Sequence, residues 1–322
     1  SMNTNRQTGE VTRDLTVGSW SGDEFDFEGA GYEINPVMTE VYSKLNETYL
    51  HAENEGSANV YDPGEPSIAE ISNANPAYKD SLKEYSDAAI VVISRPSAES
   101  TDYLPGGIAE GLGADEPLQL TANERDIISL AKESSDNVIV LINTATPVEI
   151  GDLKNDSEID SILWIGFPGC YGMLGVSDIL CGRTSPSGGL PDIYATSNLS
   201  APAMQNMGHF QFTNADDVIT RGSGQFGGDV GTYLIEAEGI YVGYRYYETR
   251  YYDAVLGQGN AASKAGTYAS RGAWNYDEEV AYGFGYGLSY TDFTQELDGE
   301  PVFNISMNPE TGAYDAKATF NV

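Results

Sequence analysis

The chain has 322 residues, of which 40% are hydrophobic, so it can bury the core of one large domain or two ordinary ones. Asp and Glu number 49 against 16 Lys and Arg, and the formal net charge at pH 7 is −33. Such a surface repels phosphate backbones and anionic lipid headgroups, so we expect neither a nucleic acid nor a membrane as a partner. The acidity suits a neutral or cationic ligand, or it reflects only an acidic proteome in the source cell.

The first 78 residues predict one clear helix. Residues 1–34 show weak periodicity and are expected to form loop with at most one short strand. Asn35 suits the cap of a helix and Pro36 its first position. One apolar face follows at a spacing of four residues: Val37, Val41, Leu45 and Tyr49. Residues 51–78 are polar and irregular, which predicts a loop or lid.

Apolar runs of strand length alternate with helical patterns over the next hundred residues. The three runs are residues 88–93, 138–142 and 162–165. Their uninterrupted apolar character is typical of neighbouring parallel strands buried on both faces. Helices are predicted from the capping box that begins at Thr121 and over residues 171–180, before Gly182. The alternation predicts an α/β fold, a three-layer sandwich around a mostly parallel sheet of about five or six strands.

This alternation ends near residue 183. Residues 205–233 and 254–275 are rich in Gly, Ser and Asn and predict surface loops. The aromatic stretch 239–248 between them is expected to pack back on the sandwich as a strand, with its tyrosines filling the core. The less favoured alternative is that one of these tyrosines or Trp274 stacks on a sugar. Near the end of the chain, residues 302–306 and 316–322 alternate like antiparallel strands.

Ligands of such sheets bind outside the carboxyl ends of the strands. The candidate site is therefore formed by the loops after Ile93, Ile142 and Ile165. The first of these loops contains Arg95, Glu99 and Asp102, and two carboxylates beside an arginine are a suitable acid–base apparatus. The alternative, which the residues alone favour, is a solvated acidic loop that Arg95 holds in place.

The two cysteines, Cys170 and Cys181, flank the predicted helix over residues 171–180. A helix of that length holds them about 15 Å apart, so we expect two reduced thiols and no disulfide. The chain has no C-x-x-C pair, which removes the usual ligands of zinc and iron–sulfur sites.

Several segments between residues 85 and 293 resemble, in the same order, motifs of the second domain of glycoside hydrolase family 3, the family of β-glucosidases, β-xylosidases and their relatives. The segment Trp164-Ile-Gly-Phe-Pro-Gly169 is similar to the family's W-x-G-x-P-G, and Pro186-Ser-Gly-Gly-Leu-Pro191 is similar to its P-S-G-[RG]-L-P. The other matching segments are residues 86–100, 137–149, 178–185, 238–248 and 284–293.

This resemblance implies a retaining, exo-acting β-glycosidase that releases terminal non-reducing sugars from β-glycosides. Such an enzyme needs two carboxylates about 5 Å apart, a nucleophile and a general acid/base. The family's pattern places the acid/base at Glu99 and the nucleophile on a separate (β/α)8 barrel. Arg95 and Asp102 are then expected to bind substrate or support the loop. The implied partners are a β-linked oligosaccharide or glycoside and the barrel of the same protein, with no cofactor and no metal.

The sequence also departs from the family's pattern. Ala98 and Ser100 flank Glu99 where the family usually has glycine, which alters the loop's flexibility and keeps the carboxylate. No Ser-Asp-Trp or Thr-Asp-Trp carries a nucleophile. The barrel is therefore missing, and we expect the chain alone to hydrolyse glycosides poorly or not at all.

We divide the chain into residues 1–293, the family's α/β sandwich domain, and residues 294–322, the start of a fibronectin type III-like domain. About 30 residues cannot complete a β-sandwich, so we expect a fragment, from a family member in which the barrel follows. A bacterial protein of the cytoplasm or the cell surface is expected. Two alternatives stay open: a non-catalytic carbohydrate-binding module that uses some of the 22 tyrosines, and a structural spacer of a cell-surface protein.

Overall fold

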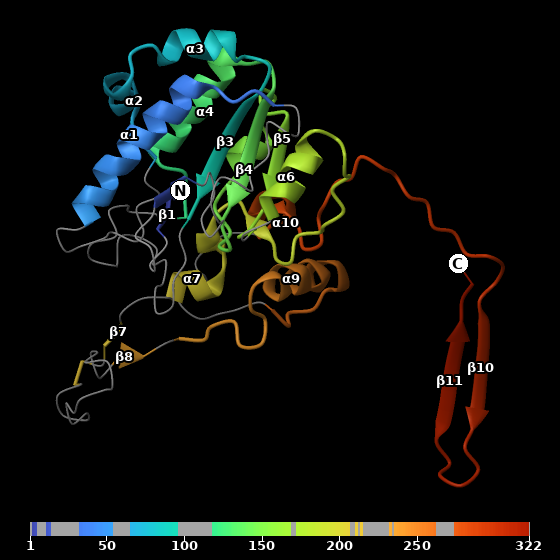
Figure 1. Cartoon of the computed structure of the whole chain (residues 1–322). Coiled ribbons are helices and arrows are strands. Elements are labelled where there is room, and N and C mark those ends of the chain that lie inside the picture. The colour runs from blue at the N-terminus through green and yellow to red at the C-terminus, as the bar shows by residue number, and fades with distance from the viewer. Residues whose placement is uncertain are drawn as a thin grey trace.

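The computed structural model shows a parallel β-sheet covered by helices, with a β-hairpin that stands away from it (Figure 1). It describes residues 2–4, 11–13, 32–53, 65–95, 118–168, 172–206, 210–211, 213–214, 232–233, 235–261 and 274–321. Among these residues, no helix combines the length and the apolar character that a membrane span requires.

The central sheet consists of β3 (Ala89–Ser94), β4 (Val138–Asn143) and β5 (Ser161–Trp164), in the order β3-β4-β5. Both pairs are parallel, which confirms the prediction for these three strands. The described part of the sheet has three strands where five or six were predicted. The prediction that all three strands are buried is wrong for β5, because this strand lies at an edge of the described sheet and Ser161 and Trp164 are exposed.

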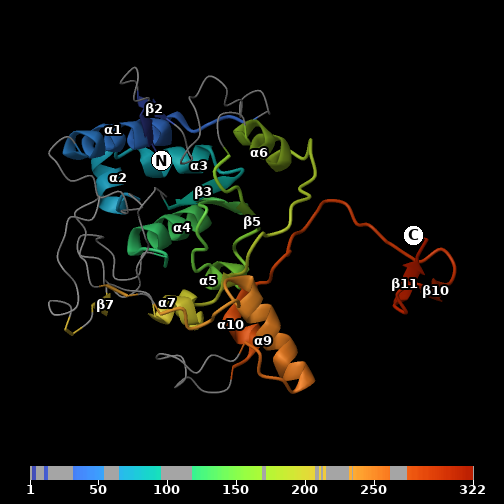
Figure 2. The same ribbon diagram turned by 90° about the horizontal axis from the view of Figure 1, so that it is seen from below.

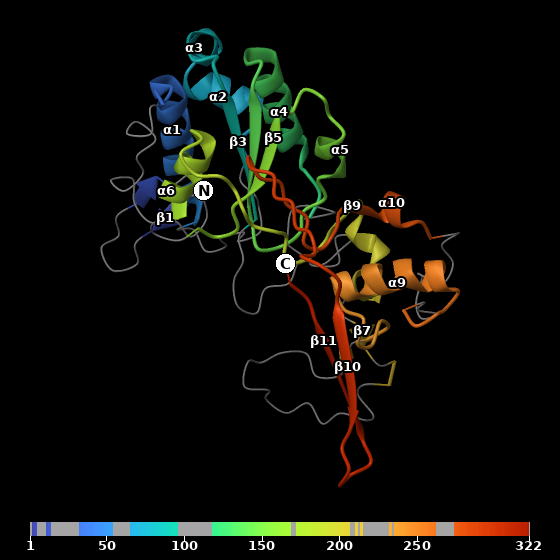
Figure 3. The same ribbon diagram turned by 90° about the vertical axis from the view of Figure 1, so that its right-hand side faces the viewer.

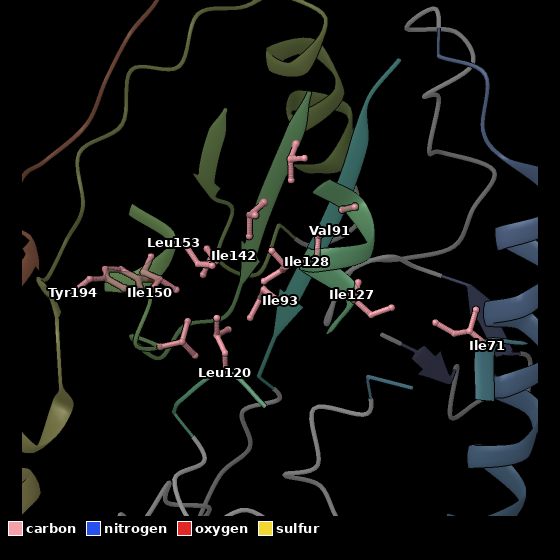
Figure 4. Packing of buried hydrophobic residues seen from close by; sticks show 14 of the residues in the cluster. Ile71, Val91, Ile93, Leu120, Ile127, Ile128, Ile142, Ile150, Leu153 and Tyr194 are labelled. Atoms are coloured by element: carbon pink, nitrogen blue, oxygen red, sulfur yellow. The ribbon is translucent and has the colours of Figure 1, made fainter. Parts of the chain in front are cut away.

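Helices cover the two faces of the sheet (Figure 3). On one face, Ile127, Ile128 and Ala131 of α4 (Ala122–Ser134) pack against Val91 and Ile93 of β3 (Figure 4). The opposite face packs against α6 (Gly172–Leu180), whose Met173 and Val176 contact Leu141 of β4. The alternation of side chains along each strand thus fills two cores, and the three-layer α/β sandwich is confirmed.

Three helices lie on the β3 side of the sheet, away from β5 (Figures 1 and 2). They are α1 (Pro36–Glu53), α2 (Ile68–Ala74) and α3 (Tyr78–Glu84). Asn35 caps α1 as predicted, since its Oδ1 accepts hydrogen bonds from the backbone N–H groups of Val37 and Met38. The predicted loop over residues 51–78 is wrong, because α2 occupies part of it and begins with a capping box of Ser67 and Glu70.

The stretch 239–248 is a turn followed by the start of α9 (Tyr244–Leu256), so the predicted strand is wrong. Aromatic residues favour strands by propensity, but here Tyr246 and Tyr247 are buried in a second core against Ile193 and Val280. The N-terminus of α9 is capped from a distance, since Asp192 Oδ1 accepts a hydrogen bond from the backbone N–H of Tyr244 at 2.8 Å. The helix ends at Gly257, which adopts a left-handed conformation.

Two glycine-rich segments, residues 185–190 and 283–290, pack against each other. Leu190 N donates to Tyr286 O at 2.8 Å, and Gly285 N donates to Leu190 O at 2.9 Å. A Cβ at Gly287 would lie 2.2 Å from the carbonyl oxygen of Gly188, so only glycine allows this approach of the two backbones.

The remaining elements are short or lie at the periphery. They are β1 (Met2–Thr4), β2 (Val11–Arg13), α5 (Gly151–Lys154), β6 (Tyr194–Ala195), a 3₁₀ turn (Asn198–Ser200), α7 (Pro202–Asn206), β7 (Phe210–Gln211), β8 (Thr232–Tyr233), α10 (Tyr276–Glu279) and β9 (Val280–Tyr282). The C-terminal hairpin consists of β10 (Val302–Met307) and β11 (Tyr314–Thr319), which pair antiparallel as predicted. That this segment begins a fibronectin-like domain stays a prediction.

Candidate active-site edge

The carboxyl ends of the three parallel strands are joined by hydrogen bonds. Asn143, at the end of β4, is fully buried and donates from Nδ2 to the carbonyl oxygen of Gly166 at 2.5 Å. Trp164 at the end of β5 donates from Nε1 to Thr144 O at 2.8 Å. On the other side, Arg95 N donates to Asn143 O at 3.4 Å. This edge of the sheet is therefore a rigid base for the loops that leave it.

Arg95 leaves the end of β3 and turns inward. Its side chain is 0% exposed and forms a two-pronged ion pair with Glu124, which is 2% exposed. Nη1 lies 2.6 Å from Glu124 Oε1, and Nη2 lies 3.0 Å from Oε2. Nη1 also donates to Ser94 O at 2.7 Å, and Nη2 to Gln119 O at 2.6 Å. In this structure Arg95 thus contacts the protein interior and presents no surface to a ligand.

Glu124 has two functions at the start of α4. Its Oε2 accepts a hydrogen bond from the backbone N–H of Thr121 at 2.8 Å, while Thr121 Oγ1 accepts one from the backbone N–H of Glu124. This is the predicted capping box. The sequence signalled only a helix start, and the pairing of the same carboxylate with Arg95 was missed because the two residues meet only when β3 and α4 pack together.

Glu99 and Asp102, the other two predicted site residues, lie outside the described residues. The same holds for Cys170. Cys181 is a free, half-buried thiol, whose Sγ donates to Asp178 O at 3.5 Å.

A further carboxylate close to this edge was not predicted from the sequence. Glu65 Oε1 accepts a hydrogen bond from the Tyr42 hydroxyl at 2.8 Å, and its carbonyl oxygen accepts one from Asn123 Nδ2 at 2.9 Å. Burial raises the pKa of Glu65 to about 7; the negative charge of Glu124 also raises it, and the hydrogen bond from Tyr42 opposes the shift. The Ser67 capping box, two residues later, was the only local signal that this segment is ordered.

Some of the aromatic residues of α9 fill a core, whereas Tyr251 and Tyr252 are exposed. Tyr246 is 1% exposed and packs edge-on against Tyr247, with the ring centroids 5.0 Å apart. The guanidinium of Arg250 lies 5.0 Å from the ring of Trp274 and 5.7 Å from that of Tyr246. Tyr246 therefore has no free face for a sugar. Across the described part of the chain, no group of three or more His, Cys, Asp or Glu side chains is arranged to hold a metal ion.

Comparison with known proteins gives a consistent result. Residues 8–290 match the family described as "Glycosyl hydrolase family 3 C-terminal domain". The curated "Beta-glucosidase A" of Butyrivibrio fibrisolvens is 30% identical over 247 residues, which is 72% of this chain and 24% of that relative. "Beta-glucosidase" of Ruminococcus albus is 28% identical over 272 residues, 83% of this chain and 23% of the relative. The chain thus spans about a quarter of the length of these relatives.

Solved structures are similar as well. A β-glucosidase from Paenibacillus barengoltzii matches with a TM-score of 0.48 at 24% identity, over 74% of this chain and 20% of that chain. A family 3 β-glucosidase from Bifidobacterium adolescentis matches with a TM-score of 0.45 at 20% identity, over 80% of this chain and 28% of that chain.

Proposed function

Because the chain belongs to the glycosyl hydrolase family 3 C-terminal domain family, we propose that it supplies the general acid/base of a retaining, exo-acting hydrolase of the β-glucosidase type. The substrate is a β-linked oligosaccharide or glycoside, from which a terminal non-reducing sugar is released. The observation that carries this proposal is the family match over residues 8–290, together with curated relatives that are named β-glucosidases.

Glu99 is the residue to which we assign the acid/base role. It follows the end of β3 in the chain, and α/β sheets bind ligands outside the carboxyl ends of their strands. Glu99 protonates the leaving oxygen in the first step and removes a proton from water in the second. A carboxylic acid that is protonated near neutral pH needs a raised pKa, which burial against a neighbouring domain or the charge of the nucleophile provides.

The nucleophile, in this proposal, is a carboxylate on a (β/α)8 barrel of the same protein, and the substrate binds between the two domains. Asp102 supports the loop that carries Glu99. Each domain alone lacks one of the two carboxylates, so this chain in isolation hydrolyses glycosides poorly or not at all.

The test is Glu99→Ala in the protein that joins this chain to its barrel. We expect the kcat on a β-linked disaccharide to fall by about 100-fold or more, because protonation of the leaving oxygen is lost. An aryl glycoside with an activated leaving group needs little protonation, so its glycosylation step should slow much less. Added azide should restore turnover, because it attacks the glycosyl-enzyme intermediate without general-base assistance.

Glu110→Ala is the matched control, since it removes another carboxylate from the segment between β3 and α4. It should leave both substrates and the azide response unchanged. If Glu99→Ala hydrolysed the disaccharide at the parent rate, Glu99 would not be the acid/base, and another residue would have this role. Binding of the disaccharide without any hydrolysis by the parent protein would favour a carbohydrate-binding module.

A further inference from the structure

The buried pair of Arg95 and Glu124 connects the two ends of one long segment. Arg95 directly follows β3, and Glu124 lies in the first turn of α4, 29 residues later. The residues between them include Glu99, Asp102 and the rest of the segment 96–117. The ion pair therefore ties the point where this segment leaves the sheet to the point where it enters the helix.

Two further hydrogen bonds of Arg95 reinforce the same connection. Nη1 donates to the carbonyl oxygen of Ser94, before the segment, and Nη2 donates to that of Gln119, after it. Glu124 Oε2 in turn accepts a hydrogen bond from the backbone N–H of Thr121. One guanidinium and one carboxylate thus hold three backbone groups around the base of the segment.

Stability alone gives a weak reason for such a pair. Removing two charges from water costs nearly as much as their attraction returns, so an apolar pair of similar volume stabilises a fold equally well or better. The planar guanidinium fork, in contrast, fixes distance and angle as no apolar contact does. The chemistry of the pair is therefore suited to setting geometry.

We propose that Arg95 and Glu124 are positioning residues, a clamp that sets where the segment 96–117 leaves the sheet and so where Glu99 meets the glycosidic oxygen. The inference rests on the proposed function, which assigns the acid/base role to Glu99. Neither residue of the clamp touches the substrate. Proton transfer requires hydrogen-bond distance, and a displacement of about 1 Å costs about 100-fold in rate, so the position of the segment's base determines kcat.

The central experiment uses the double variant Arg95→Met/Glu124→Leu in the protein that includes the barrel. This variant replaces the buried pair by apolar side chains and leaves no unpaired charge. It also removes the hydrogen-bond partners of Ser94 O, Gln119 O and Thr121 N, so we expect a moderately lower melting temperature in a chain that still folds. The kcat on a β-linked disaccharide should fall about 10- to 100-fold with KM nearly unchanged. The kcat/KM on an activated aryl glycoside, which reports the glycosylation step, should change less than about threefold, since that step needs little acid for such a substrate.

Arg95→Lys provides a second variant, which keeps the positive charge and loses the fork. It should show the same selective loss on the disaccharide, so the proposal stays testable if the double variant does not fold. Arg125→Met is the matched control, because Arg125 is the next residue on α4 and forms an exposed pair with Asp152 at 3.2 Å. It should leave both substrates unchanged.

Equal losses of kcat/KM on the two substrates, or no loss on the disaccharide, would overturn the clamp. A normal disaccharide rate in Glu99→Ala would instead overturn the proposed function. The two failures are distinguishable, because each is measured on its own variant: a collapse in Glu99→Ala with full activity in both clamp variants rejects only the clamp.

Discussion

The central sheet and the C-terminal hairpin are built from similar strands in opposite surroundings. β4 (Val138–Asn143) and β10 (Val302–Met307) both have six residues and begin with valine. Ile142 of β4 is 0% exposed, whereas Ile305 of β10 is 73% exposed. The difference lies in the partners, because helices cover both faces of the sheet and no described element covers the hairpin (Figure 1). A strand pattern thus predicts extended backbone, and the surrounding elements decide burial.

The hairpin has two chemically different faces. Phe303, Ile305 and Met307 point to one face together with Tyr314, which is paired with Met307. Asn304 and Ser306 point to the other face, where Lys317 is paired with Asn304. An isolated two-stranded hairpin is marginally stable in water, so we expect its opening to be independent of the unfolding of the sheet.

The largest expected effect tests this contrast directly. Ile142→Ala removes a buried side chain between β3, β4 and α4, and we expect it to lower the free energy of unfolding by about 2–5 kcal/mol. Ile305→Ala is the matched substitution in the hairpin and should change that free energy by less than about 0.5 kcal/mol. Both values come from denaturant unfolding followed by far-UV circular dichroism. Similar losses in the two variants would show that the hairpin unfolds together with the sheet.

The same contrast, between what neighbouring residues determine and what the surroundings determine, explains which features could be predicted from the sequence. The strands β3 and β4 and the cap of α4 depend on neighbouring residues, and all were predicted. The cap of α9 was missed because Asp192 lies 52 residues before Tyr244. The pairing of Arg95 with Glu124 was missed for the same reason, since it exists only after β3 and α4 have packed. The capping box at Ser67 is local, and here the polar composition of the segment concealed a short helix. The roles of Glu99 and Asp102 stay predictions.

A second prediction concerns the contact between the two glycine-rich segments, residues 185–190 and 283–290. Gly287→Ala places a Cβ 2.2 Å from Gly188 O, so the two glycine-rich segments must separate. We expect the free energy of unfolding to fall by about 1–3 kcal/mol. Gly188→Ala is the matched control, since its Cβ would have no neighbour within 4 Å, and its effect should stay below about 0.5 kcal/mol. Equal effects in the two variants would mean that the contact between these segments does not stabilise the fold.

The smallest expected effect is a pH dependence of stability that arises from Glu65. Burial raises the pKa of Glu65 to about 7 from an ordinary value of 4.5, so the folded chain keeps a proton that the unfolded chain releases. The contribution of Glu65 to stability is therefore most favourable below pH 4.5, falls as the pH rises to about 7, and stays lower above it. Glu65→Gln removes this loss while its side-chain oxygen still accepts from Tyr42. We expect the variant to be about 1 kcal/mol more stable than the parent at pH 8 and equally stable at pH 4.5.

Glu70→Gln, on the first turn of α2, gives the control of opposite sign. The hydrogen bonds from Ser67, the side-chain bond first and the backbone bond second, lower the pKa of Glu70. Its stabilisation is therefore present above its ordinary pKa and is lost as the pH falls through the lowered pKa, so Glu70→Gln should reduce stability more at pH 8 than at pH 3. Thermal melts of the parent and both variants between pH 3 and pH 8 measure the two slopes. If Glu65→Gln melts in parallel with the parent over that range, Glu65 titrates at its ordinary pKa and is not buried in the folded chain.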